Sequence, residues 1–118
     1  MSTRNSRIDY IELPAADAER LVQARSFYTA VFNWQYKDWG ETYSDTAESG
    51  VSSGINADDN HRPRSPLVVV YADDLEAIRD GVIVAKGTIS RDIFSFPGGR
   101  RFHFIDPADN ELAVWSEK

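Results

Sequence analysis

The chain has 118 residues, of which 42% are hydrophobic and 27% charged, and these values are ordinary for a soluble globular protein. Its net charge of -6 argues against nucleic acid and against a membrane as partners, because both attract a basic surface. Cysteine is absent, which excludes disulfides, thiolate metal sites and cysteine nucleophiles. The opening residues MSTRNSR show no apolar leader, so we expect a cytoplasmic protein that forms one domain over residues 1–118.

Residues 8–13 predict the first strand, because apolar and polar side chains alternate along them. Ile11 and Leu13 are expected to face one side of the sheet, and Tyr10 and Glu12 the other. Pro14 ends this strand.

A helix is predicted next, from the N-cap Asp17 to Phe32, with Asn33 closing it. Its buried stripe is expected to contain apolar residues that recur at helical spacing, namely Leu21, Ala24, Tyr28 and Val31. Phe27 and Phe32 are expected to broaden this stripe as core residues. Short strands at 34–37, 42–46 and 51–55 complete a first module over about residues 7–56.

The second half repeats this order after a polar linker over about residues 57–66. A strand at 67–71 precedes a helix that begins at the N-cap Asp74 and is stopped by Gly87. A strand at 88–93 and a final hairpin complete a second module over about residues 67–117. The sequence therefore predicts an α+β fold of two strand-helix-three-strand modules, with the helices on the outer face of an open, curled mixed sheet.

The closing stretch, residues 93–116, carries the strongest signal for a site. Its apolar positions alternate with Arg101, His103 and Trp115, and the residues between Asp106 and Asn110 are typical of a turn. If both helices cover one face, the opposite face forms a concave cleft that would suit a small molecule. The residues predicted on that face are Tyr10, Glu12, Leu67, Val69, Tyr71, Arg101, His103, Ala113 and Trp115.

Two residues of this face are candidate catalytic groups. His103 could act as a general base or could be a strand histidine bonded to a neighbour. Glu12 could be a carboxylate base or could form an ion pair with Arg101. Arg101 could hold a substrate carboxylate or could be solvated. Tyr10, Tyr43, Tyr71 and Trp115 are the aromatic residues expected to bind ligand. Tyr43, Trp115 and also Trp39 could stack on a planar ligand or could belong to the core or a dimer contact.

The motifs IDYIELPAAD, RSFYTAVFNWQYKDWG and FSFPGGRRFHFIDPADNELAVW resemble the glyoxalase/bleomycin-resistance/extradiol-dioxygenase family, the vicinal oxygen chelate superfamily. The resemblance implies two βαβββ modules around an open cleft, and a homodimer. It also implies that members with metal chemistry carry His, Gln or Glu ligands on the first and last strands of each module. In this chain those positions correspond to Tyr10, Leu67 and Ala113, and the fourth, near residues 51–55, offers only serines. None of these is a standard ligand of a divalent ion, so we expect no metal and no cofactor.

Three functions remain open at this point. The first is a metal-free protein that binds a small aromatic or carboxylate-bearing molecule, or sequesters a drug as bleomycin-resistance proteins do; the acidic composition would also suit a cation. The second is a lyase or isomerase of the lactoylglutathione lyase type, or a metal-free variant in which Glu12 or His103 carries protons. The third is a structural or regulatory dimer without a working cleft.

Overall fold

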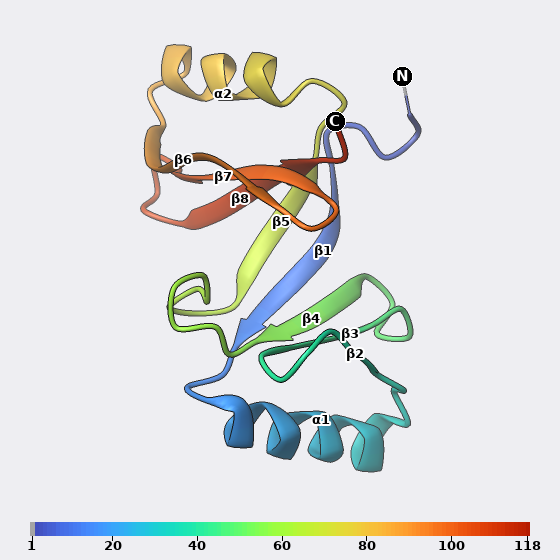
Figure 1. Cartoon of the computed structure of the whole chain (residues 1–118). Coiled ribbons are helices and arrows are strands. Elements are labelled where there is room, and N and C mark those ends of the chain that lie inside the picture. The colour runs from blue at the N-terminus through green and yellow to red at the C-terminus, as the bar shows by residue number, and fades with distance from the viewer. Residues whose placement is uncertain (1) are drawn as a thin grey trace. The chain divides into compact units, whose positions relative to one another are not determined.

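The computed structural model describes residues 2–118. Within them the chain forms two helices and eight strands (Figure 1): β1 (Arg7–Pro14), α1 (Ala18–Phe32), β2 (Lys37–Asp38), β3 (Tyr43–Thr46), β4 (Ser52–Asn56), β5 (Leu67–Tyr71), α2 (Leu75–Val84), β6 (Thr88–Phe96), β7 (Gly99–Ile105) and β8 (Glu111–Ser116). The predicted α+β class is confirmed: the strands form an open mixed sheet in the order β2-β3-β4-β1-β5-β8-β7-β6. No helix in this part of the chain is long and apolar enough to cross a membrane.

The chain divides into two compact units. The α1 unit comprises Tyr10–Leu67, and the α2 unit comprises Met1–Asp9 together with Val68–Lys118. That the two units form a single domain stays a prediction.

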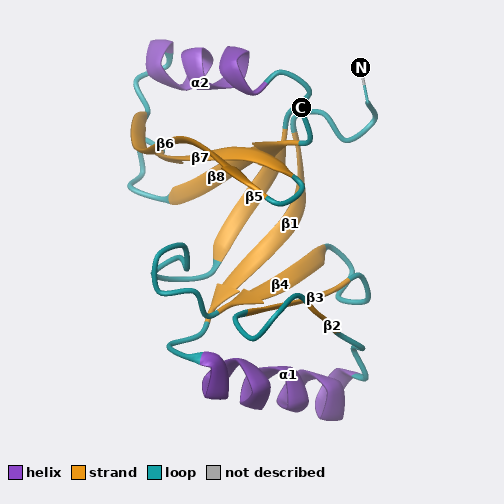
Figure 2. Cartoon of the chain, in the orientation of Figure 1, coloured by secondary structure: helices purple, strands orange, loops and turns teal. Residues whose placement is uncertain are grey.

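In the α1 unit, helix α1 covers one face of the strands (Figure 2). The carboxylate of Asp17 accepts a hydrogen bond from the backbone N–H of Arg20 at 2.8 Å, and Asn33 ends the helix in the left-handed conformation, as predicted. Strand β1 runs parallel to β4, so Leu13 is paired with Ile55 and Glu12 with Gly54. Ile55 packs in the core beneath α1, and the alternation of strand side chains therefore turns Glu12 to the opposite face.

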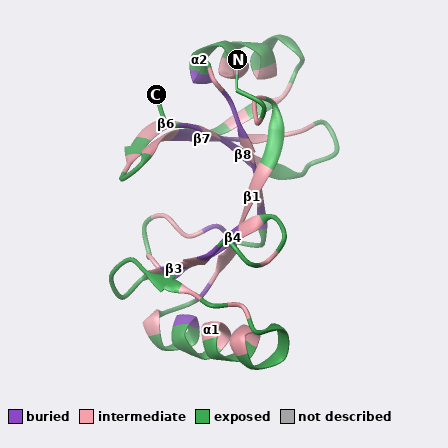
Figure 3. Cartoon of the chain, turned by 90° about the vertical axis from the view of Figure 1, so that its right-hand side faces the viewer, coloured by how far each residue is buried: buried purple, intermediate pink, exposed green. Residues whose placement is uncertain are grey.

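The structure corrects the expected core of α1. Leu21 is buried, but Phe27 is 59% and Phe32 55% exposed, and Val31 is also exposed. Most of α1 is exposed or only partly buried (Figure 3). The cause is geometric: the strands that contact α1 are β3 and β4, which have only four and five residues against the 15 of the helix, so part of the helix has no strand facing it. Phe32 instead stacks on Trp34, with ring centroids 4.9 Å apart.

In the α2 unit, α2 lies along one face of β6, β7 and β8 (Figure 2). Phe102 of β7 is paired with Val114 of β8, and both are buried in the core with Leu75 of α2. The helix ends at Val84, three residues before the predicted stop at Gly87. Strand β6 continues to Phe96, past the predicted end at residue 93, and this extension contributes to the site described next.

Candidate functional site

The face of the α2 unit that points away from α2 gathers basic and aromatic side chains. His103 of β7 is paired with Arg91 of β6, and Arg101 is paired with Phe94. Since Phe102 between them is buried against α2, Arg101 and His103 lie on the opposite face, as the alternation predicts. We call the four residues Arg91, Phe94, Arg101 and His103 the His103 site.

His103 is the buried titratable group of this site, with 5% of its surface exposed. Burial lowers its pKa to about 4, and the positive charges of Arg101 and Arg91 contribute to the decrease. The imidazole is therefore neutral at pH 7. Among residues 2–118, nothing lies within hydrogen-bonding distance of its Nε2 atom, and its Nδ1 atom is 3.8 Å from a carboxylate oxygen of Glu111, beyond a normal hydrogen bond.

The two arginines of the His103 site share an aromatic neighbour. The guanidinium of Arg91 lies 4.0 Å from the ring centroid of Phe94, and that of Arg101 lies 5.4 Å from it. The guanidinium of Arg101 is also 5.9 Å from the ring of Phe96. Arg91, Phe94 and Phe96 were not predicted as site residues. The spacing of Phe94 and Phe96 was a signal that the strand continues, but strict alternation would place Arg91 on the other face, and only the register shift between Arg91 and Phe94 brings them to one face.

A second aromatic group lies on the same face, at the ends of β5 and β8. The rings of Tyr71 and Trp115 meet edge to face with centroids 5.0 Å apart, and the indole N–H of Trp115 donates to Asp9 at 2.9 Å. The guanidinium of Arg4 lies 3.8 Å from the centroid of Tyr71 and 5.4 Å from that of Trp115. Arg4 also forms an ion pair with Glu117.

The predicted site residues of the α1 unit form a hydrogen-bonded chain. The hydroxyls of Tyr10 and Tyr43 are 2.5 Å apart, and the Tyr43 hydroxyl donates to a carboxylate oxygen of Glu12 at 3.1 Å. Burial raises the pKa of Tyr43, and the charge of Glu12 raises it further, so the phenol stays a donor. Gly54 makes room for this chain, because a Cβ there would lie 2.1 Å from the Tyr10 hydroxyl and 2.4 Å from the Tyr43 hydroxyl.

The structure thus brings the predicted site residues together in two groups, one in each unit. Glu12, Tyr10 and Tyr43 are in contact in the α1 unit. Arg101, His103, Tyr71 and Trp115 share one face of the α2 unit. That both groups line one cleft stays a prediction.

The positions that the family resemblance assigns to metal ligands carry residues with few free donor atoms. Leu67 and Ala113 have no donor atom, and the Tyr10 hydroxyl is engaged with Tyr43. On β4, the Ser53 hydroxyl bonds Ser49 at 2.7 Å. Within residues 2–118, no three His, Asp or Glu side chains are grouped so that they could hold a metal ion.

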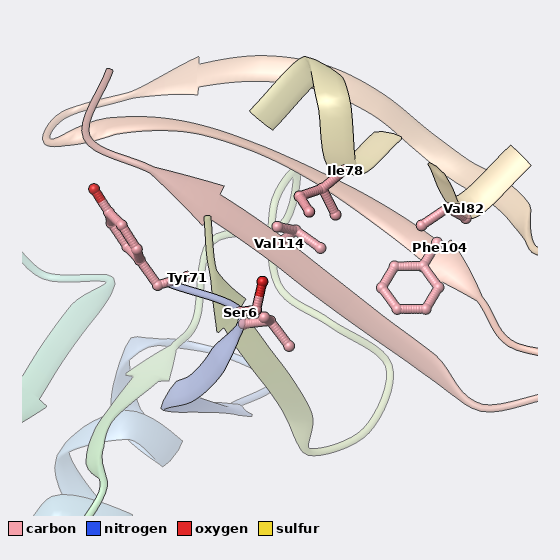
Figure 4. A pocket seen from close by; sticks show the side chains of 7 residues that line it. Ser6, Tyr71, Ile78, Val82, Phe104 and Val114 are labelled. Carbon is pink, nitrogen blue, oxygen red and sulfur yellow. The ribbon is translucent and has the colours of Figure 1, made fainter. Parts of the chain in front are cut away.

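The α2 unit also contains an apolar hollow on its helix side. A cavity of about 210 Å³ lies between α2 and the strands, and Ile78 and Val82 extend over Val114 and Phe104 (Figure 4). Its lining is almost entirely apolar, with Ser6 at its border. It lacks the polar groups that would orient a ligand, which separates it from the His103 site.

Comparisons with known proteins identify the family. Residues 7–114 match the model of the Glyoxalase/Bleomycin resistance protein/Dioxygenase superfamily. The chain belongs to this superfamily. A search of curated proteins finds no match.

Solved structures of this fold are similar over most of the chain. A Legionella pneumophila protein described as an NAD-dependent benzaldehyde dehydrogenase is 12% identical, with a TM-score of 0.75 over 92% of this chain and 98% of that one. The Mn(II)-bound glyoxalase from Novosphingobium aromaticivorans is 18% identical, with a TM-score of 0.66 over 97% of this chain and 40% of that one. Methylmalonyl-CoA epimerase from Mycobacterium tuberculosis is 13% identical, with a TM-score of 0.61 over 98% and 91%. These identities establish a common fold alone.

Proposed function

We propose that this superfamily member binds a small carboxylate-bearing aromatic molecule at the His103 site, without a metal ion. The observation that carries the proposal is the buried Nε2 atom of His103, which has no hydrogen-bond partner among residues 2–118. Buried polar atoms nearly always have a partner, and leaving one without costs about 1–3 kcal/mol. A ligand oxygen at this atom would remove that cost.

The charge of the site favours an anion. Burial is the main cause of the low pKa of His103, and the positive charges of Arg101 and Arg91 lower it further. These charges lower the pKa although a carboxylate oxygen of Glu111 lies 3.8 Å from Nδ1 of His103, so the potential at the imidazole is positive. A carboxylate compensates this potential, and a guanidinium can hold it through two parallel hydrogen bonds. The rings of Phe94 and Phe96 near the guanidinium of Arg101 give the site the partly aromatic lining that an aromatic ligand would suit.

The test is calorimetric titration with benzoate and related aromatic carboxylates, and with the matching neutral alcohols. We expect the carboxylates to bind and the alcohols to bind at least roughly tenfold more weakly, as loss of a charge-assisted hydrogen bond implies. Replacing Arg101 with Gln, or the less buried Arg91 with Gln, should abolish the preference. Arg79→Gln is the matched control, because Arg79 lies on α2 and pairs with Asp92. Equal affinity for acids and alcohols would refute the proposal.

Carboxylate binding should also depend on pH. An anion next to His103 favours its charged form and raises its pKa above the value of about 4 in the free protein. Binding should therefore take up protons, and affinity should increase as the pH falls from 7 toward 5, where benzoate is still mostly ionised. Calorimetry in two buffers of different ionisation enthalpy measures the uptake. Proton release on binding would contradict this reasoning.

A metal-free proton transfer at the same site is the second candidate function. His103 is unprotonated at pH 7, as a general base must be before it acts, although its pKa of about 4 makes it a weak base in the free protein. A bound carboxylate would raise this pKa toward the working pH and so strengthen the base. We would test it by following exchange of the ligand's α-proton in deuterated buffer by NMR. If the protein is an enzyme of this kind, His103→Gln should stop exchange while binding of the carboxylate remains measurable. No exchange with any ligand that binds would leave the binding function alone.

We further propose a homodimer located in the cytoplasm. The family resemblance supports the dimer, and a composition ordinary for a soluble globular protein supports the location. Sedimentation equilibrium tests the first proposal, and fractionation of the source cells tests the second. A purely monomeric protein at micromolar concentration would refute the dimer.

A further inference from the structure

The amino-terminal segment Ser2–Ser6 is held on the α2 unit by several separate contacts. The backbone N–H and the hydroxyl of Ser2 both donate to the carboxylate of Asp73, at 2.9 and 2.8 Å. The side-chain oxygen of Asn5 accepts from the backbone N–H of Asp73 at 2.8 Å, and the N–H of Ser6 donates to the carbonyl of Tyr71 at 2.8 Å. We call Ser2–Ser6 the amino-terminal strap.

Arg4 is the residue of the strap that points onto the aromatic pair. Its guanidinium lies over the Tyr71 ring and near the Trp115 ring, and it is tied to the carboxylate of Glu117. The hydrogen bond to Glu117 is the main reason why the pKa of Arg4 is raised. Two aromatic rings beside a carboxylate are the combination that proteins use to recognise organic cations.

We infer that Tyr71, Trp115 and Glu117 form a binding site for a small organic cation, such as a quaternary ammonium or a guanidinium, and that Arg4 is its internal occupant. A cation of this class would have to displace the Arg4 side chain in order to reach the Tyr71 ring. The apparent affinity for the cation is therefore the intrinsic affinity multiplied by the fraction of molecules in which the strap is open. This inference does not depend on the carboxylate site at His103, which uses other residues.

The strap is built so that it can open. The contacts of Ser2 and the ion pair of Arg4 are at the surface, with 38% of the Arg4 side chain and 55% of the Glu117 side chain exposed, and exposed pairs of this kind contribute little to stability. The hydrogen bond from Asp73 to Asn5 is half-buried. Ser6 has a φ of 60°, a left-handed conformation that costs a residue other than glycine some strain. Ser6 therefore marks the hinge, because everything on its amino-terminal side can leave without disturbing a strand. Segments with few buried contacts open at low free energy.

The test compares cation binding by the wild-type protein and by Arg4→Ala. Choline is the probe, and its uncharged carbon analogue 3,3-dimethylbutan-1-ol is the control ligand. The indole N–H signal of Trp115 reports binding by NMR. We expect Arg4→Ala to bind choline on the order of tenfold more tightly than wild type, the factor for a competent state populated at about 10%, while the alcohol binds neither protein. Arg7→Ala, which removes a neighbouring exposed arginine, should behave as wild type.

Asp73→Asn is the second variant, since it weakens the anchor of Ser2 without touching the aromatic pair. It should increase choline affinity in the same direction, by a smaller factor. In wild type, choline should speed amide exchange at Ser6, whose N–H is bonded to Tyr71. Equal choline affinity in wild type and Arg4→Ala, or equal binding of choline and the alcohol, would overturn the inference. Neither result would affect the carboxylate titrations, so the two proposals can fail separately.

Discussion

His103 should make the stability of the protein depend steeply on pH between 4 and 6.5. Its pKa falls from 6.5 in the unfolded chain to about 4 in the folded protein, mainly through burial. The unfolded chain therefore binds more protons in this range, and the free energy of unfolding rises with pH. The stability that depends on a neutral His103 is fully present above pH 6.5 and is lost as the pH falls toward 4. The two pKa values correspond to a difference of about 3 kcal/mol.

Urea unfolding of wild type and His103→Gln at several pH values from 4.5 to 7.5 measures this contribution. The variant should lose most of the pH dependence in this window, whatever its stability at pH 7, so the slope and not the absolute value carries the test. His61→Gln is the control for loss of an imidazole, since His61 lies in a loop with its side chain 44% exposed. Carboxylates whose pKa is lowered in the folded protein, such as those of Asp92 and Asp106, change the free energy of unfolding in a lower pH range, below their pKa near 4 in the unfolded chain. Identical slopes in wild type and His103→Gln would refute a buried neutral imidazole.

Two further predictions concern packing. Gly54→Ala should destabilise the protein by about 1–3 kcal/mol and break the hydrogen bond between Tyr43 and Glu12, because the new methyl group overlaps the hydroxyls of Tyr10 and Tyr43. Gly81→Ala in α2 should instead stabilise the protein by about 0.5–1 kcal/mol, because a Cβ there meets nothing within 4 Å. Leu21→Ala should cost about 2–5 kcal/mol, whereas Phe27→Ala, at a 59% exposed position, should cost under about 1 kcal/mol in thermal or urea unfolding. A cost for Phe27→Ala as large as that for Leu21→Ala would show that this side chain is covered in solution.

The alternation of residues along the strands could be predicted because it follows from the backbone alone. In β7, Phe102 and His103 face opposite sides whatever the rest of the chain does, and the register with β8 carries the same alternation to Val114 and Trp115. The caps at Asp17 and Asn33 were likewise local signals. These features needed no knowledge of distant contacts.

The contacts of Arg4, Phe27 and Phe94 could not be predicted in this way. Arg4 precedes the first strand, and only the folded chain brings it to Tyr71, which is 67 residues away. The apolar stripe of α1 includes Phe27 at the correct spacing, but burial depends on how much sheet faces the helix. Phe94 lies beyond two register shifts between β6 and β7, and such irregularities have no reliable sequence signal.

The net charge of -6 suggested a cationic ligand, but the local environment of His103 indicates an anion for that site. Exposed charges are screened over about 8 Å in physiological salt, so surface carboxylates at a greater distance have little effect on a buried group. Arg91 and Arg101 lie close to the imidazole, and they depress its pKa in spite of the acidic composition. At Tyr71 and Trp115 the nearest charged partner of Arg4 is a carboxylate, and there the local and the overall charge agree. The charge of the ligand at each site therefore follows from the nearest buried or paired groups, and the two titrations proposed above should give opposite charge preferences in one protein.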